Sequence, residues 1–367
     1  MDNRVKSVFG KYAEQLQVLV DTNLDAFKES FFSRYFPLGS PQMSLNFSTI
    51  IGKQRIEAAA SVVAHGSEAP LRSRAGLERV AGEIAAIKVK RKMDDQSYRE
   101  WLTMQAVATT DQAKKQQIIS LIWDDVQYVV DSVTARMDWM TAQALSSGKI
   151  ALSTANNPDG YSPGDVDLLV PAANKQHGGT AFGWTDNDQY WAGGGTADNP
   201  ISDLVYFTDA VYKASGVKFE KVIMTPTKWH KVRKSLELTT RFDSKFPALD
   251  TVNTELQSLG LPIIELLDPH IKVETNGIVS AISAWADDKY ITFLPFSQAG
   301  IMHNALSIEQ ISPVTGVDYA TANNILVSKW AQTEPFGEYT RGELAAFPGL
   351  EVADTMYIVN TEHATIF

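Results

Sequence analysis

The sequence contains no cysteine among its 367 residues, so disulfide bonds and thiolate chemistry are both excluded. It also lacks any run of about 18 uninterrupted apolar residues, and we therefore expect no membrane-spanning helix. The N-terminal segment MDNRVKSVFGKYAEQ has no apolar core of the kind found in a secretory signal. Together these absences predict a protein of the reducing cytoplasm, or of a particle that is assembled there.

Concentrated positive charge is also scarce. The formal net charge is -10, and the longest basic segment is the short run KVKRK at 88–92. A sequence-specific nucleic-acid-binding protein would normally carry a concentrated basic face. The composition therefore argues against that class of protein.

The sequence carries none of the catalytic or cofactor motifs that we sought. GxGxxG, GxSxG and HExxH are missing, and the pair Gly148–Lys149 lacks the upstream glycine and the following Ser or Thr of a phosphate-binding loop. The six histidines are scattered without the spacing of metal ligands, and neighbouring acidic residues direct their side chains apart. We therefore expect no catalytic residue, no cofactor and no bound metal.

The most extended pattern that is present runs from Asp111 to Ser147. Apolar residues recur in steps of three and four from Ile118 to Ala144, without Gly or Pro, and Gly148 follows in the position of a C-terminal cap. At about 1.5 Å per residue this segment predicts a helix of about 55 Å, which is longer than a compact domain is wide. We expect it to be a spine against which other parts of the chain pack.

Two extended segments precede this spine helix. Residues 1–43 form an amphipathic arm that ends in the aromatic cluster FFSRYF at 31–36, which needs a surface of its own chain or of a neighbouring subunit to cover it. Residues 44–95 have the pattern of a β-hairpin, in which the alternation at 84–92 is one strand and the far end is rich in Gly and charge. Because an isolated two-stranded ribbon is marginally stable in water, we expect this loop to lie against another molecule. The alternative is a flexible surface loop.

The chain after the spine helix divides into three parts. Residues 172–198 are rich in Gly, Asn, Asp and Trp and predict a long loop between units. Residues 199–322 predict a compact α+β domain that begins with a helix at Pro200 and contains a hairpin around Asn276–Gly277. Residues 323–367 predict strands that return to the sheet beside the spine helix.

In this order the segments resemble the major capsid protein of tailed bacteriophages, and in detail the lambda-type branch of the Hong Kong 97-type fold. Three stretches carry the likeness: FKESFFSRYFPLGSPQMSLNFSTIIG at 27–52, PLRSRAG at 70–76, and the helix–strand–helix pattern of 199–236 with ASGV at 214–217. The sequence of the spine helix and the 172–198 loop depart from the pattern of that branch. The likeness therefore spans most of the chain, although its motifs are individually short.

The resemblance implies an α+β fold of Hong Kong 97 type with an N-terminal arm, an extended β-hairpin loop, a peripheral domain built on the spine helix, and an axial domain. The corresponding ranges are 1–43 for the arm, 44–95 for the loop, 96–198 with the return strands of 323–367 for the peripheral domain, and 199–322 for the axial domain. The implied function is self-assembly into hexamers and pentamers that form an icosahedral shell around double-stranded DNA.

The implied partners are further copies of the chain, scaffolding and portal proteins, and packaged double-stranded DNA bound without sequence specificity, but no membrane; a decoration protein stays open. The implied location is the virion, after assembly in the host cytoplasm. We expect inter-subunit contacts from charged residues of the loop and from aromatic residues of the arm, namely Arg72, Arg74, Glu78, Arg79, Phe31, Phe32 and Tyr35.

Two other functions remain open at this point. The first is an encapsulin-like protein compartment with the same fold, which would enclose a cargo enzyme instead of DNA. The second is an α+β enzyme with residues 198–310 as its catalytic domain, which predicts a monomer or small oligomer with a deep pocket.

Overall fold

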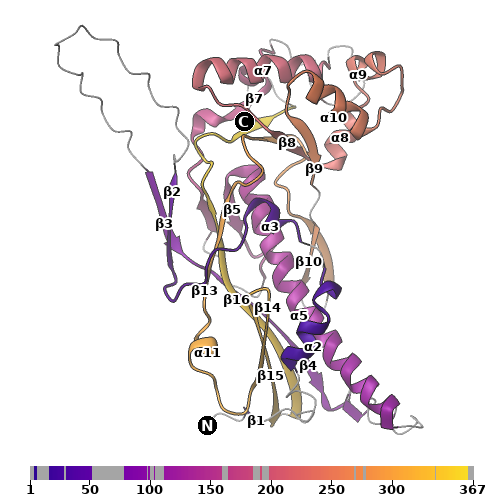
Figure 1. The fold of residues 1–367 in the computed structure, drawn as a ribbon, viewed down its shortest axis with the longest axis vertical. Helices are drawn as coiled ribbons and strands as arrows, with labels where there is room; N and C mark the ends of the chain where they lie inside the picture. Colours follow the sequence, from indigo (N-terminus) through magenta and orange to yellow (C-terminus); the bar gives the residue numbers. More distant parts are fainter. Residues whose placement is uncertain are drawn as a thin grey trace, which may run out of the picture.

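The computed structural model describes residues 4–5, 16–28, 30–51, 78–96, 98–99, 103, 111–158, 164–184, 191, 198–267, 270–275, 278–334 and 336–362. The protein is elongated, and its centre is the helix α5 (Asp111–Ser147), which lies along the long strands β15 (Ile325–Thr333) and β16 (Phe336–Leu350) (Figure 1). The predicted spine helix is confirmed over its full range. Its C-terminal cap is also confirmed, because Gly148 has a φ of 68° and its N–H donates to the carbonyl oxygen of Ala144.

A six-stranded sheet supports α5. The two long strands β15 and β16 pair with each other at its centre. β15 also pairs with β1 (Arg4–Val5) and β14 (Asp318–Ala322), and β16 also pairs with β4 (Ala86–Asp94) and β13 (Gly300–Ala305). Valines of α5, among them Val126, Val129 and Val133, are fully buried between the helix and this sheet. The helix approaches the sheet so closely that a Cβ at Gly342 would lie 2.9 Å from the carbonyl oxygen of Val129. The approach is therefore possible only without a side chain at this position.

A second sheet lies beyond the C-terminal end of α5, and its strand order is β7 (Lys175–His177), β17 (Tyr357–Asn360), β12 (Tyr290–Leu294), β8 (Lys221–Met224) and β9 (Ile263–Leu266). The helices gathered around it are α7 (Pro200–Ser215), α8 (Pro226–Val232), α9 (Leu236–Arg241) and α10 (Leu249–Ser258) (Figure 1). The helix predicted to begin at Pro200 is confirmed. Proline occupies its first turn, and Gly216 ends it with a φ of 70°.

Three smaller units lie outside these two sheets. The hairpin β10 (His270–Thr275) and β11 (Ile278–Ser283) is confirmed where the sequence predicts it, and β5 (Lys149–Leu152) pairs with β6 (Gly164–Asp167) directly after α5. The short helix α11 (Ile308–Ile311) begins with a capping box at Ser307. None of the described helices combines the length and the apolar character that a bilayer-spanning helix needs.

Four strands pair differently from the prediction. The alternating segment at 84–92 does form a strand, but that strand is β4, and it pairs with β16 instead of closing the extended loop. β13 and β14 fall within the range predicted for the axial domain, yet they belong to the six-stranded sheet, whereas β17 pairs with β12 and does not return to α5. Alternation identifies a strand, but the partner depends on contacts that are distant in sequence.

The described part of the stretch 172–198, which was predicted to be a loop between units, contains regular structure and buried side chains. It contains η2 (Ala172–Asn174), β7 and α6 (Gly178–Ala181). The indole N–H groups of Trp184 and Trp191 donate to the carboxylate of Asp203 on α7, at 3.2 and 2.8 Å. The tryptophans therefore form part of the hydrophobic core of the second sheet, and this correction follows from burial that composition alone does not reveal.

Candidate inter-subunit interface

A two-stranded hairpin projects from the body of the protein. β2 (Asn46–Ile51) and β3 (Glu78–Glu83) pair antiparallel over six residues, and Figure 1 shows the pair standing to one side of the six-stranded sheet. The N–H of Ile84 donates to the carbonyl oxygen of Leu45 at 2.7 Å and closes the root of the hairpin. Two side chains next to this root are exposed, Met43 at 78% and Leu45 at 46%. A ribbon of this kind gains stability by packing on another surface.

The structure describes only some of the charged residues that were predicted to make contacts at the loop. Arg72 and Arg74 lie outside the described residues. Glu78 and Arg79 begin β3, where they are in register with Ile51 and Ile50 of β2, and only their backbone is described. Their role in contacts between subunits therefore remains a prediction.

The aromatic residues of the arm pack mainly within their own chain. Phe32 is 4% exposed and Tyr35 is 0% exposed, and both belong to the core that surrounds α5. The prediction that these two side chains contact a neighbouring subunit is therefore corrected, because no part of Tyr35 and little of Phe32 is available to a second molecule. Phe31 is partly buried against the same core, so a contact through this ring remains a prediction.

The described part of the arm continues along the body of the protein. The helix α2 (Leu16–Thr22) lies against β14, where the side-chain amide of Gln17 both donates to and accepts from the backbone of Thr321, at 3.0 and 2.8 Å. After α3 (Phe32–Tyr35), the segment of 37–42 runs parallel to β13, where it exchanges backbone hydrogen bonds with Met302 and the N–H of Gln42 donates to the carbonyl oxygen of Asn304. Over these residues, the surface that covers the arm belongs to its own chain.

Two aspartates of α5 hold the arm where it crosses the helix. Asp138 accepts hydrogen bonds from the backbone N–H groups of Phe31 and Phe32, at 3.1 and 2.9 Å, and Asp131 accepts one from the N–H of Lys28 at 3.1 Å. Burial raises the pKa of Asp138 to about 6, although the two backbone hydrogen bonds act in the opposite direction. The seven-residue spacing places both carboxyl groups on one side of the helix, two turns apart.

An ion-pair network joins the arm to the second sheet. Arg34 of α3 lies 2.6 Å from one carboxylate oxygen of Glu265 on β9, and Lys221 of β8 lies 2.8 Å from the other. Burial by itself would raise the pKa of Glu265, but the hydrogen bonds from Lys221 and Arg34 bring that pKa below its usual value. The network stabilises the position of the arm beside the second sheet.

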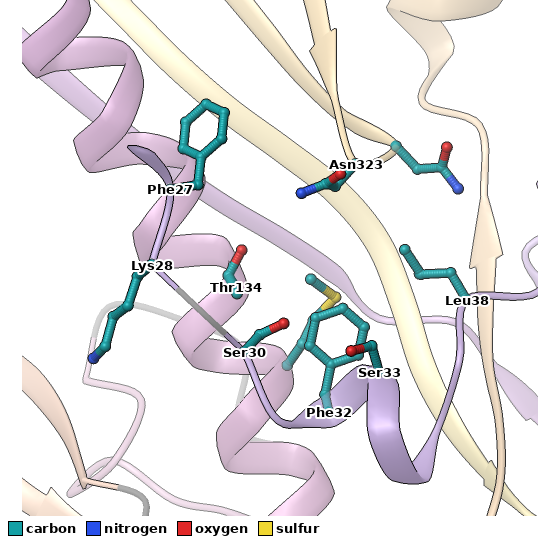
Figure 2. A pocket seen from close by; sticks show the side chains of 10 residues that line it. Phe27, Lys28, Ser30, Phe32, Ser33, Leu38, Thr134 and Asn323 are labelled. Carbon is teal, nitrogen blue, oxygen red and sulfur yellow. The ribbon is translucent and has the colours of Figure 1, made fainter. Parts of the chain in front are cut away.

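A small hollow of about 280 Å³ lies between the arm, α5 and the turn after β14. Figure 2 shows Phe32, Ser33 and Leu38 around it, while the Lys28 side chain points away. This volume is at the lower limit of small-molecule sites, and the hollow does not lie in the unit 198–310. Within the described part of the chain, no group of three or more His, Cys, Asp or Glu residues could hold a metal ion.

Sequence reasoning did not find the aspartates that hold the arm. The available signal was two acidic residues seven positions apart in a helix that is otherwise apolar on its buried sides. The adjacent acidic residues Asp124 and Asp125 do direct their side chains apart, as the sequence predicts for such neighbours: Asp124 is exposed, whereas Asp125 is buried, 3.3 Å from Arg91 of β4.

Comparison with known proteins identifies the family. The profile of the family described as phage major capsid protein E matches residues 22–266, about two thirds of the chain. The chain belongs to this family. The projecting hairpin, the arm and the spine helix are thus features of a capsid shell protein of the Hong Kong 97-type fold, and the location of the protein is the virion.

Solved structures agree with this fold for the capsid protein. The putative capsid protein of a prophage of Escherichia coli CFT073 is 15% identical, with a TM-score of 0.56 over 95% of this chain and 98% of that chain. A phage-related protein of Bordetella bronchiseptica RB50 is 12% identical, with a TM-score of 0.53 over 95% of this chain and 97% of that chain. No curated relative matches the sequence. At these identities the structures establish the shared fold alone.

Proposed function

We propose that the capsid protein assembles into hexamers and pentamers that close an icosahedral shell around the double-stranded DNA of a tailed bacteriophage of the lambda-type branch. The observation that carries this proposal is the hairpin of β2 and β3, which projects from the body with exposed apolar residues at its root. A surface that extends beyond its own core gains stability from neighbouring copies, and head-to-tail contacts that close on themselves produce rings.

The other roles implied by the resemblance belong to the same proposal. The shell forms in the host cytoplasm, receives DNA through a portal protein, and is assembled with scaffolding protein. The protein itself catalyses no reaction. A decoration protein on the outer surface is compatible with this role. The net charge of -10 supports the role of a container for DNA, since an acidic wall repels the packaged polyanion and favours its release.

Electron microscopy of the purified full-length protein tests the assembly directly. We expect closed shells or rings of five and six subunits in negative stain. A uniform population of monomers at all protein and salt concentrations would contradict the proposal and favour a self-contained enzyme. Analysis of the contents of shells from infected cells separates the two shell functions, because double-stranded DNA indicates a virion and a cargo enzyme indicates an encapsulin-like compartment.

Charge reversal at the loop tests where neighbouring subunits meet. We expect the double variant Arg72→Glu and Arg74→Glu to abolish shell formation while the subunit stays folded, because like charges facing each other across an interface repel. The control is the double variant Lys213→Glu and Lys245→Glu, which changes the net charge by the same amount at two exposed positions. The measurement is sedimentation combined with circular dichroism. Normal shells from the arginine variant would refute this role of the loop.

A further inference from the structure

The short helix α11, which connects β13 to β14, has no buried residue. Its two isoleucines, Ile308 and Ile311, are 78% and 49% exposed. They are three positions apart in the helix, so their side chains lie on the same side of it. A helix that served only to pack on its own chain would bury these side chains. We therefore searched the surroundings of α11 for a contact surface.

Polar contacts hold α11 in a fixed position although it is exposed. In the capping box, the N–H of Ser307 donates to the side-chain oxygen of Gln310 at 2.9 Å. Glu309 lies 2.6 Å from Arg341 of β16 and accepts a hydrogen bond from the hydroxyl of Tyr319 on β14 at 3.1 Å. Apolar side chains on a segment that is already fixed lose little conformational entropy on binding, so they suit the anchor position of an interface.

The root of the hairpin of β2 and β3 continues this apolar surface. The N–H of Leu306 donates to the carbonyl oxygen of Gln42 at 2.9 Å, which places the chain that follows Gln42 beside the start of α11. The exposed side chains at the root of the hairpin belong to this part of the chain. Together with the isoleucines they form one surface, which we call the α11 patch: Met43, Leu45, Ile308 and Ile311.

A second exposed apolar surface lies on β11. Among the described residues this strand pairs only with β10, so one edge of it is open. Ile271 and Val273 of β10 are buried in the core that surrounds α5, whereas Ile278 and Val279 of β11 are 72% and 57% exposed. We call Ile278 and Val279 the β11 edge. An open strand edge with exposed apolar side chains promotes pairing with another chain unless something covers it.

The two surfaces lie on opposite sides of the elongated subunit. Figure 1 shows α11 and the hairpin of β2 and β3 on one side of the body, and β10, the partner strand of β11, on the other. Contacts between two different surfaces are head-to-tail and form a ring when their rotation closes, whereas a twofold contact uses the same surface on both copies. This placement therefore favours a contact that repeats around an axis.

We propose that the α11 patch of one subunit covers the β11 edge of the next subunit in the same ring. The inference rests on the proposed function, which supplies the ring. Each subunit then covers the β11 edge of one neighbour, and its own β11 edge is covered by the other neighbour. The two surfaces occur in equal numbers, so the contact needs only further copies of this chain. Apolar side chains at the centre of a contact are also what subunit interfaces favour.

Cross-linking between introduced cysteines tests the contact directly, because the chain has no cysteine of its own. The variant carries Ile308→Cys and Val279→Cys, and its assembled rings and shells are treated with a short bismaleimide reagent. We expect denaturing electrophoresis to show a ladder of linked subunits that ends at five and six. Each single-cysteine variant should run as a monomer, because neither surface meets its own copy.

Three results of this experiment would overturn the inference. Shells of the double variant without a ladder would show that the two surfaces do not meet. Dimers from either single variant would show that the surface faces its own copy. A ladder that ends at three would place the contact around a threefold axis instead of within the ring. A wild type that forms no rings or shells would contradict the proposed function as well, whereas shells without the ladder overturn this inference alone.

Serine substitutions test whether the apolar contact stabilises the ring. The variant carries Ile308→Ser and Ile311→Ser, and the matched control carries Ile308→Leu and Ile311→Leu, which keeps apolar side chains at the same positions. We expect the serine variant to raise the subunit concentration for half-assembly at least about tenfold, as loss of an anchor residue does, and the control to stay within about threefold of the wild type. Sedimentation measures assembly, and circular dichroism confirms that the subunits are folded. Assembly of the serine variant at the wild-type concentration would overturn the inference.

Discussion

Replacing Asp138 should loosen the arm from α5. Its carboxylate accepts two backbone hydrogen bonds, from Phe31 at 3.1 Å and from Phe32 at 2.9 Å, and both N–H groups lose their acceptor in Asp138→Ala. A hydrogen bond to a charged group contributes about 1.5 to 3 kcal/mol, and removal of a buried carboxylate offsets part of the loss. We therefore expect Asp138→Ala to lower the free energy of unfolding by about 2 kcal/mol.

The variant Asp138→Asn separates the hydrogen bonds from the charge. Both N–H groups donate to the same oxygen, Oδ1, which asparagine retains. The folded-state pKa of Asp138 is raised to about 6, above the value of about 3.9 in an unfolded chain, so the folded state binds the proton more tightly. The stabilisation that comes from this tighter proton binding by Asp138 is fully present below about pH 4 and is lost as the pH rises through about 6. Two pH units correspond to about 3 kcal/mol in total, and about 2 kcal/mol of this falls between pH 4.5 and pH 7, so the asparagine variant should gain about 2 kcal/mol relative to the wild type over that interval.

Urea unfolding at pH 4.5 and pH 7 measures these differences, and hydrogen exchange at the amides of Phe31 and Phe32 reports on the arm itself. The matched control is Asp124→Asn, which removes the same charge from an exposed position on the same helix. We expect this control to follow the pH profile of the wild type. The reasoning is refuted if Asp138→Ala keeps the wild-type protection of both amides, or if the profiles of Asp138→Asn and the wild type are parallel.

Two further predictions concern packing and buried charge. Gly342→Val should lower the melting temperature and reduce the free energy of unfolding by about 2 to 3 kcal/mol, because its Cβ would lie 2.9 Å from the carbonyl oxygen of Val129. An unchanged melting temperature would show that α5 does not approach β16 this closely. Glu362→Ala should destabilise the protein by about 3 kcal/mol, because Lys228, whose side chain is 0% exposed, loses the carboxylate 2.9 Å from its Nζ. Urea unfolding of that variant with Lys228→Met added should show partial recovery, and no recovery would contradict this explanation.

The elements that the sequence predicted well are those set by local patterns. The period of apolar residues between Asp111 and Ser147 requires a helix whatever the rest of the chain does, and Gly148 ends it because a left-handed conformation favours glycine. Pro200 and Gly216 delimit α7 for similar reasons. The resemblance to capsid proteins added the fold, since the order of these elements is itself characteristic.

The candidate interface was predictable only in part. The sequence indicated a hairpin and an arm, but it extended the hairpin to β4 and assigned Phe32 and Tyr35 to a neighbouring subunit. An aromatic cluster shows that apolar area must be covered and does not show by which surface. The aspartates at 131 and 138 were missed for a related reason, because their partners are backbone N–H groups about a hundred residues away.

The sequence by itself determined that this chain has a spine helix, a compact α+β unit and a strand-rich tail, because helix and strand periods are properties of neighbouring residues. The tertiary structure alone decided which strands share a sheet and which surface covers the arm. Those outcomes depend on distant segments coming together, and no local pattern encodes the partner.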